Sequence, residues 1–289
     1  MIYLKDFNLL DDYSEYLIKS CEETRRIFNS DYPLRIFSSK QFKDIIFDDI
    51  TIFYGGNGSG KTTLLNIISE KINASRKNAF DKGPLFDKYV KSCDYKMSIE
   101  IPKEIKIISS DDVFDYLIDI RSINSGVNRR KEFLSKEYLD KKYSVDNSSF
   151  LNYEQVKEKY DSKTKSMSEY VREKLVNNNI IEQSNGESAL MFWEREIKEN
   201  SIYILDEPEN SLSALNQLKL KKFIEESVRF YNCQFIISTH SPFLLNLYEA
   251  KIYNLDLNPV EVKIWTELET VKLYYDFFKE NEIDFKENK

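Results

Sequence analysis

The chain has 289 residues and a formal net charge of -7, with 41% hydrophobic and 31% charged side chains. Such a composition is typical of a globular protein with a sizeable core, and the length fits one large domain or one domain with a lobe. The acidic balance argues against a wholly basic nucleic-acid binder but leaves local basic patches open. The sequence contains no run of about 18 apolar residues, so it predicts no membrane span.

The N-terminus and the cysteines indicate the cellular compartment of the protein. The N-terminus is acidic and polar, and it lacks the basic and then apolar layout of a secretory signal. Cys21, Cys93 and Cys233 are far apart and have no metal-like spacing. They are expected to be reduced thiols, which favours a cytoplasmic protein.

In the first part of the chain the sequence predicts helix and then strands. Residues 1–30 are expected to be mostly helical and to face solvent. Three short extended runs follow, LRIF, IIF and ITIFY. The last leads into GGNGSGKT and a helix, TTLLNIISEKIN, and two more strands follow, YKMSIEI and EIKIIS.

Residues 112–180 are predicted to be helical, rich in lysine and glutamate, and nearly free of glycine. Within them, positions 129–174 carry 12 basic and 9 acidic side chains, an excess of three positive charges, so the rest of the chain stands at -10. This excess offers side chains that could contact phosphates, although alternating charges on a helix more often form a solvated face. The side chains in question are Arg129, Arg130, Lys131, Lys141 and Lys142.

From residue 188 strands and helices alternate. A helix, SALMFWEREIKE, precedes the strand SIYIL, and a long amphipathic helix precedes the strand QFIIS. A short helix, the runs IYNLD and VEVKIW, and a last helix complete the chain. Alternating strand and helix predicts an α/β fold, a mostly parallel sheet covered by helices.

The stretch GGNGSGKT holds four of the chain's seven glycines and matches the phosphate-binding pattern G-x-x-x-x-G-K-[ST]. It lies between an apolar strand and an apolar helix, so backbone N–H groups and the helix N-terminus can point at one anion. Lys61 is expected to reach the β- and γ-phosphates of a nucleotide, and Thr62 to coordinate Mg²⁺. The residues expected to bind nucleotide here are Gly55, Asn57, Gly58, Ser59, Gly60, Lys61, Thr62 and Thr63.

Two further motifs supply polar groups after apolar strands. Asp206 directly follows the run Ile-Tyr-Ile-Leu, which predicts a carboxylate at a strand end facing the Mg²⁺ site, and Glu207 could orient or deprotonate a water. His240, the one histidine of the chain, follows the strand QFIIS and is a candidate to contact the γ-phosphate. Ligands of α/β sheets collect at this edge.

Together these motifs resemble an ABC-type ATPase over about residues 30–260. The resemblance rests on the P-loop at 55–62, a signature-like QSNGES at 183–188, the LDEP at 205–208 and His240. It implies a P-loop NTPase head with an antiparallel N-terminal strand region and a helical lobe. One ABC-type domain would then cover residues 1–289, with the lobe inserted at 112–187 and ending in the signature-like motif.

The resemblance also implies roles. ATP and Mg²⁺ would be the ligands, with Thr62 and Asp206 at the metal and Glu207 and His240 catalytic. In a head-to-tail dimer, Ser184 and Gly186 of one chain would cap the γ-phosphate bound by Lys61 of the other. DEPENSLS and STHSPFLL are similar to stand-alone bacterial "AAA family" ATPases of the RecF, overcoming-lysogenization-defect and SMC types.

The sequence departs from that family's pattern at several positions. Asn185 and Glu187 replace the usual glycine and glutamine of the signature, and Ser213 stands where many members have aspartate. No glutamine follows EIKIIS, where Ser109, Ser110 and Asp111 are the nearest candidates to contact Mg²⁺ and the γ-phosphate. Phe37 or Phe42 could stack on adenine, and each is equally consistent with a core position.

Three functions follow from the sequence. The first is an ATP-dependent dimeric switch acting on nucleic acid or a nuclease partner, as in DNA repair or phage defence. The second is the nucleotide-binding subunit of an ABC transporter, against which the altered signature and missing glutamine weigh. The third is a non-hydrolysing ATP sensor that regulates a protein partner, against which Glu207 and His240 argue.

Overall fold

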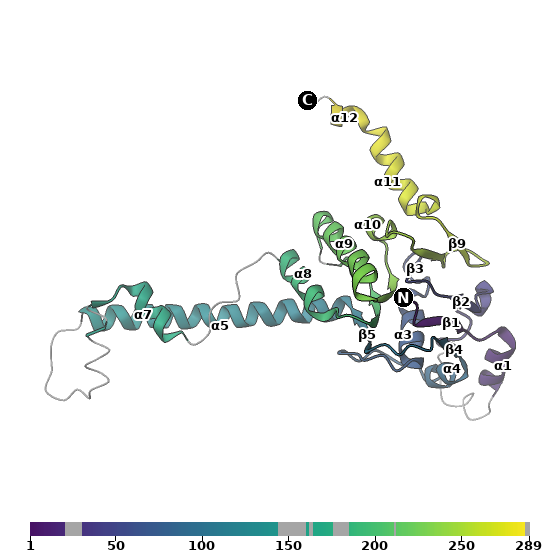
Figure 1. Cartoon of the computed structure of the whole chain (residues 1–289), viewed down its shortest axis with the longest axis horizontal. Coiled ribbons are helices and arrows are strands. Elements are labelled where there is room, and N and C mark those ends of the chain that lie inside the picture. Colours follow the sequence, from purple (N-terminus) through teal and green to yellow (C-terminus); the bar gives the residue numbers. More distant parts are fainter. Residues whose placement is uncertain (21–30, 144–159, 162–163, 176–184, 211, 287–289) are drawn as a thin grey trace. The chain divides into compact units, whose positions relative to one another are not determined.

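The computed structural model describes residues 1–20, 31–143, 160–161, 164–175, 185–210 and 212–286, and Figure 1 labels its elements. The chain divides into two compact units. The first unit comprises Met1–Phe114 together with Asn185–Lys289, and the second comprises Asp115–Ser184. A single ATPase domain with a lobe at 112–187 remains the proposed division of the chain.

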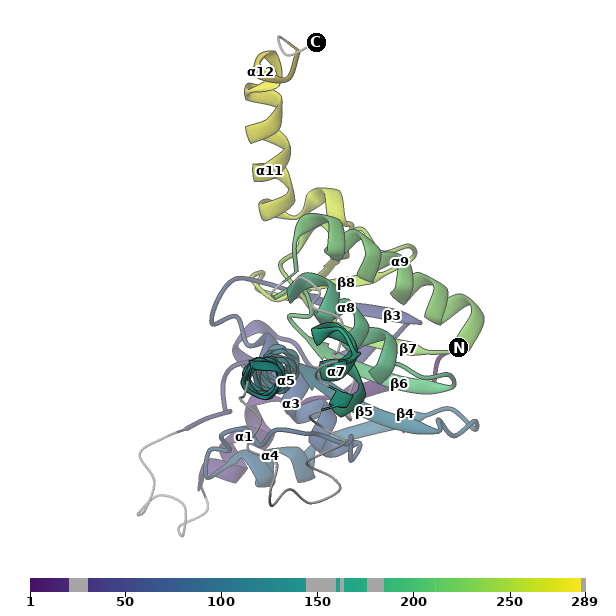
Figure 2. The same cartoon turned by 90° about the vertical axis from the view of Figure 1, so that its left-hand side faces the viewer.

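The first unit is built on a six-stranded sheet with the order β5-β6-β7-β3-β8-β9. Figure 2 shows β8, β3, β7, β6 and β5 one beside another in this order. The first five strands are mutually parallel, and β9 pairs antiparallel with β8. The mostly parallel α/β sheet expected from the sequence is therefore confirmed. The strands are β3 (Ile50–Tyr54), β5 (Glu104–Ser109), β6 (Ser201–Asp206), β7 (Gln234–Ser238), β8 (Lys251–Asn254) and β9 (Glu261–Lys263).

The central strands are short apolar runs because both of their faces are covered. Every residue of β3 and β7 is buried, as are the first five of β6. In the register of these strands Asp206 pairs with Ser238, and Ser238 pairs with Phe53. The segments that follow β3, β6 and β7 consequently begin at one edge of the sheet, and this edge carries the candidate site.

A second sheet of three antiparallel strands has the order β2-β1-β4, and it confirms the predicted antiparallel N-terminal region. Its strands are β1 (Leu4–Asn8), β2 (Asp44–Ile46) and β4 (Asp94–Met97). The expectation of a mostly helical, solvent-facing N-terminus is wrong for β1, where Leu4 and Phe7 are fully buried. Helix α1 (Asp12–Ser20) follows, and residues 21–30 lie outside the described part.

Pairing partners far along the chain explain why the sequence did not predict β1 as a strand. β1 forms its hydrogen bonds with β2 and β4, which lie about 40 and 90 residues away, so its short run carries little local strand signal. The extended run expected at 34–37 is also wrong: these residues form turns in which Leu34 and Phe37 are buried.

Gln234 connects the two sheets. This fully buried side chain at the start of β7 accepts the N–H groups of Tyr3 (2.9 Å) and Leu4 (2.8 Å) on its oxygen. Its amide nitrogen donates to the carbonyl oxygens of Leu4 (2.9 Å) and Asp48 (3.2 Å). All of its hydrogen-bonding capacity is thereby used on backbone groups of the segment that precedes β3 and of β1.

The main core lies around α3 (Lys61–Lys71), whose Leu64, Leu65, Ile67 and Ile68 are fully buried. They share one cluster with residues of both sheets, such as Phe7 of β1 and Ile204 of β6. This packing fixes where α3 begins relative to β3. The remaining elements of the unit are α4 (Phe86–Ser92), α8 (Asn185–Glu196), α9 (Ala214–Tyr231), α10 (Pro242–Leu245), α11 (Glu269–Glu280), α12 (Glu282–Lys286) and the 3₁₀ turns η1 (Ser38–Lys40) and η2 (Trp265–Glu267).

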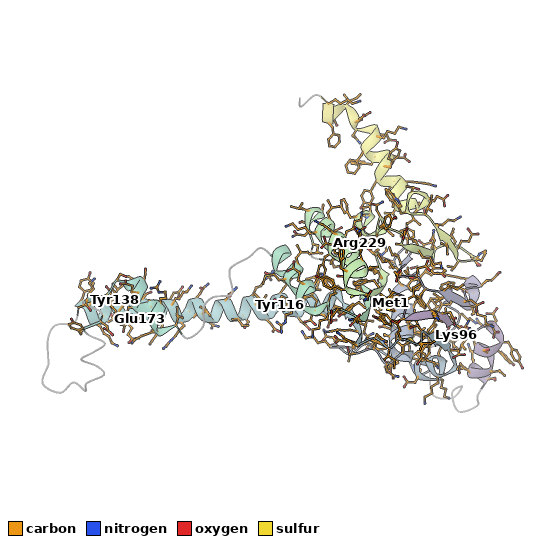
Figure 3. All side chains as sticks on the ribbon, in the orientation of Figure 1. Met1, Lys96, Tyr116, Tyr138, Glu173 and Arg229 are labelled. Carbon is orange, nitrogen blue, oxygen red and sulfur yellow. The ribbon has the colours of Figure 1, made fainter. Side chains whose placement is uncertain are left out.

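The second unit contains most of α5 (Ser110–Tyr143) and α7 (Met167–Lys174). The ring centroids of Tyr138 on α5 and Tyr170 on α7 lie 5.4 Å apart, and Lys174 Nζ lies 3.2 Å from Glu137. Figure 3 labels Tyr138 on α5 and Glu173 on α7. Across the described residues, no helix is both long and apolar enough to cross a membrane.

Candidate functional site

The loop between β3 and α3 requires glycine at two positions. Gly58 has a φ of +79° and Gly60 a φ of +103°, in the left-handed region that other residues rarely adopt. A Cβ on Gly60 would also lie 2.7 Å from Ile36 Cγ2. Gly60 precedes the first helical residue, and no side chain caps α3 there. The first N–H groups of α3 therefore have no intrahelical acceptor and can bind an anion.

Lys61 lies inside this loop and is only 5% exposed. Its ammonium donates to the carbonyl oxygens of Gly55 (2.8 Å) and Gly56 (3.1 Å). Burial lowers the pKa of Lys61, and the nearby carboxylates of Glu207 and Asp206 oppose that shift. The loop thus holds a cation next to its own N–H groups, as phosphate binding requires.

Asp206 and Thr62, the two expected metal ligands, are brought together. Thr62 Oγ1 lies 3.3 Å from Asp206 Oδ1, and the hydroxyl of Ser238 donates to the same oxygen. Burial raises the pKa of Asp206, while the two hydroxyl donors act in the opposite direction.

The described residues contain no group of three or more His, Cys, Asp or Glu side chains suited to a metal ion. The pair formed by the Thr62 hydroxyl and the Asp206 carboxylate fits Mg²⁺, which proteins bind through one or two side chains while phosphates and water supply the other ligands. Thr62 and Asp206 are the residues that would hold it.

Glu207 and His240 face each other beside Asp206. Glu207 has a left-handed φ of +49°, and its N–H donates to Ser238 O (3.0 Å) and Ser238 Oγ (3.1 Å). Its Oε2 accepts from the side chain of Asn210 at 3.1 Å, and its Oε1 lies 3.4 Å from His240 Nε2. Burial, followed by the charge of Lys61, lowers the pKa of His240, so the imidazole is neutral at pH 7.

The sequence did not identify two residues that brace the loop. Asp256, after β8, accepts the Gly56 N–H on both carboxylate oxygens, at 2.9 and 2.8 Å. Lys40 donates to the carbonyl oxygens of Ser59 (2.9 Å) and Leu255 (2.6 Å). For Asp256 the available signal was the one used for Asp206, an acid after an apolar strand. For Lys40 the sequence offered none.

The positions that depart from the family pattern have defined surroundings. Ser109 pairs with Asp206 in the sheet, and its N–H and hydroxyl donate to Asp112 at 2.8 and 3.0 Å. Of the three candidates for the missing glutamine, Ser109 is therefore the one paired with Asp206, whereas Ser110 and Asp111 begin α5. Ser213 instead caps α9 by accepting the Asn216 N–H at 3.4 Å.

Neither phenylalanine considered for adenine stacking is accessible. Phe37 and Phe42 are 0% and 4% exposed and belong to the core cluster. A Cβ on Gly60 would lie 3.2 Å from the Phe37 ring, so this side chain supports the loop from behind. Tyr32 is an aromatic residue near the first turn of α3, where its hydroxyl donates to Thr63 Oγ1 at 3.2 Å.

The signature-like motif is only partly described. Gln183 and Ser184 lie outside the described residues, as do the side chains of the next three positions. The structure starts α8 at Asn185, three residues earlier than the N-terminus expected at Ser188. The roles expected of Ser184 and Gly186 remain predictions.

The fold and the loop define the class of protein, a P-loop α/β nucleotide-binding fold. The family model described as "ABC transporter" matches residues 45–210, more than half of the chain. The chain belongs to this family. No curated protein matches the sequence.

Solved structures with similar folds include SMC heads and an ATP-binding cassette. The SMC head domain from Thermotoga maritima has a TM-score of 0.42 and 15% identity, covering 91% of this chain and 99% of that one. The Smc head of Pyrococcus furiosus bound to the C-terminal domain of ScpA gives 0.40 and 14%, covering 96% and 100%. A dimeric ATP-binding cassette with ADP and Pi gives 0.34 and 15%, covering 76% and 88%.

Proposed function

We propose that the chain binds ATP with Mg²⁺ at residues 55–62 and hydrolyses it to ADP and phosphate. One observation carries the proposal: three segments distant in sequence bring a buried lysine, a hydroxyl–carboxylate pair and a glutamate–histidine pair to one sheet edge. Membership of the ABC family supports the same activity.

Each of these groups has a chemical task in phosphoryl transfer. Lys61 and the N–H groups at the start of α3 bind the phosphates, and Thr62 and Asp206 are the residues that would hold Mg²⁺. When bound there, Mg²⁺ would supply positive charge that neutralises the phosphate oxygens. Glu207 orients the attacking water and accepts its proton. His240, neutral and 3.4 Å from Glu207, donates a hydrogen bond to the γ-phosphate.

The same proposal includes an ATP-dependent homodimer in the cytoplasm. Ser184 and Gly186 of one chain would close the site of the other, as the ABC resemblance implies. We place the chain in the non-transporter branch, acting on nucleic acid or on a nuclease partner. Arg129 and Arg130 support this placement because both are exposed on α5, whereas Lys141 is already paired with Glu137.

The test of hydrolysis uses Glu207→Gln, with Glu226→Gln as the matched control because Glu226 is exposed on α9. Light scattering after size-exclusion chromatography is measured with and without MgATP, together with phosphate release. We expect Glu207→Gln to bind ATP, to turn over at least ~100-fold more slowly, and to form a dimer only with ATP. The control should match the wild type. Unchanged turnover in Glu207→Gln would remove Glu207 from the role of base.

The same samples decide what the ATP is used for. DNA affinity of the Glu207→Gln dimer is measured over a salt series, with Arg129→Glu/Arg130→Glu against Lys219→Glu/Lys222→Glu, two exposed lysines of α9. Loss of two phosphate contacts should reduce the salt slope by about 2, and the control should retain it. A dimer that does not bind DNA would favour a protein partner. Copurification of a membrane protein would favour the nucleotide-binding subunit of a transporter. ATP binding without turnover would favour the non-hydrolysing sensor.

A further inference from the structure

Glu209 makes an unusual set of contacts next to the candidate site. It lies three residues after Asp206, in the segment between β6 and α9. Its Oε1 accepts three hydrogen bonds from consecutive residues after β7: Thr239 Oγ1 (2.7 Å), His240 N (2.7 Å) and Ser241 N (3.2 Å). Its Oε2 is buried and has no hydrogen-bond partner among the described residues. One carboxylate oxygen therefore gathers the segment that carries the histidine.

The backbone of His240 is connected directly to this carboxylate. The backbone N–H of His240 donates to Glu209, and its Nε2 has no hydrogen-bond partner in the described part of the chain. Ser241 has other anchors, because its N–H also reaches Thr239 Oγ1 (3.0 Å) and its hydroxyl donates to Gln217 (2.7 Å). Three hydrogen bonds to one buried oxygen therefore hold this segment, and the His240 backbone with it, to Glu209.

The same contacts connect the two proposed catalytic groups. Glu207 is fixed to the end of β7 through Ser238, and His240 is fixed to the segment after β6 through Glu209. The two segments thus hold each other, and the distance of 3.4 Å between Glu207 Oε1 and His240 Nε2 follows from both connections. Removal of the Glu209 oxygen would free one of them.

We propose that Glu209 is a positioning residue, whose Oε1 holds the segment 239–241 so that the imidazole of His240 faces Glu207 and the site of the γ-phosphate. The kinetic part of this inference rests on the proposed hydrolysis of ATP. Burial raises the pKa of the Glu209 carboxyl, and the hydrogen bonds from Thr239 and His240 act against that shift. A glutamine oxygen can accept the same three bonds, so the neutral variant Glu209→Gln should preserve the arrangement.

The kinetic test compares Glu209→Ala, Glu209→Gln, His240→Ala and the double variant Glu209→Ala/His240→Ala. We expect Glu209→Ala to lower kcat at least ~10-fold with KM changed by less than ~3-fold, because only transition-state positioning is lost. Glu209→Gln should restore kcat to within about 3-fold of the wild type. The double variant should be no slower than His240→Ala, since both changes remove one function. Additive losses would overturn the proposal.

A second readout does not depend on turnover. Because the chain has one histidine, its imidazole NMR signal reports on His240 alone. In Glu209→Ala the signal should shift and the pKa of His240 should rise toward its ordinary value, as the ring leaves its buried place among Lys61, Glu207 and Asp256. Glu209→Gln should retain the wild-type signal.

The matched control is Glu15→Ala. Glu15 is also a buried glutamate with one unpartnered oxygen among the described residues, and its other oxygen accepts from Arg35 N (2.7 Å) and Ser38 Oγ (2.9 Å). Its loss should lower stability and leave the histidine signal in place. A wild type without turnover would refute the proposed hydrolysis, whereas the NMR comparison would still decide the role of Glu209. An unchanged His240 signal in Glu209→Ala would overturn that role.

Discussion

Gly60→Ala tests the geometry of the phosphate loop, with Gly58→Ala as its matched control. Both glycines lie in the loop with left-handed φ values, +103° and +79°. A Cβ at Gly58 meets no atom within 4 Å. One at Gly60 lies 2.7 Å from Ile36 Cγ2 and 3.2 Å from Phe37 Cε1. The two variants therefore share a backbone penalty, and only Gly60→Ala adds a steric clash.

The expected losses of stability follow from these two contributions. A left-handed alanine costs about 1–2 kcal/mol, which is the whole expected effect at Gly58. Overpacking adds about 1–3 kcal/mol, since the buried Phe37 cannot move freely. Gly60→Ala should then be less stable than Gly58→Ala by about 2 kcal/mol. With an m-value of roughly 2 kcal/mol/M, the urea midpoints should differ by about 1 M.

Urea unfolding of both variants is followed by tryptophan fluorescence, and ATP affinity is measured on the folded proteins. Gly60→Ala should also bind ATP more weakly than Gly58→Ala, because the clash displaces the residue just before the first N–H groups of α3. Equal midpoints for the two variants would refute the close packing of Ile36 and Phe37 behind the loop.

Three other changes test separate parts of the structure. Lys61→Ala should abolish ATP binding without lowering the urea midpoint, because burial already disfavours its charge; normal affinity in a nucleotide titration would refute the loop assignment. Glu15→Gln should be more stable than the wild type at pH 7. Burial raises the pKa of Glu15 in the folded state above its value in the unfolded state. Wild-type stability therefore falls as the pH rises from the unfolded-state pKa through the folded-state pKa, and the stability gained by Glu15→Gln should vanish below about pH 4. A gain in stability that is independent of pH would contradict this reasoning. Gln234→Leu should cost at least ~2 kcal/mol in urea unfolding, since it leaves buried N–H groups of Tyr3 and Leu4 unpaired, and a neutral effect would show that the two sheets do not depend on this link.

The sequence alone determined the parts of the site that are continuous in the chain. The pattern from Gly55 to Thr62 between a strand and a helix, and Asp206 after four apolar residues, are local features, and the structure places them at one sheet edge. The mostly parallel sheet was also predictable, because its central strands are apolar runs separated by helices. The antiparallel N-terminal region was expected only through the family resemblance.

Only the tertiary structure decided which distant residues support these motifs. β1 becomes a strand through partners about 40 and 90 residues away, and its own short sequence does not show this. Asp256 reaches Gly56 across 200 residues, and Glu209 reaches His240 across 31. Such contacts form because parallel strands bring their carboxyl ends to one edge, and neither spacing nor periodicity records which of the side chains there will meet. The core positions of Phe37 and Phe42 were likewise settled by packing, since a buried ring and a stacking ring have the same local pattern.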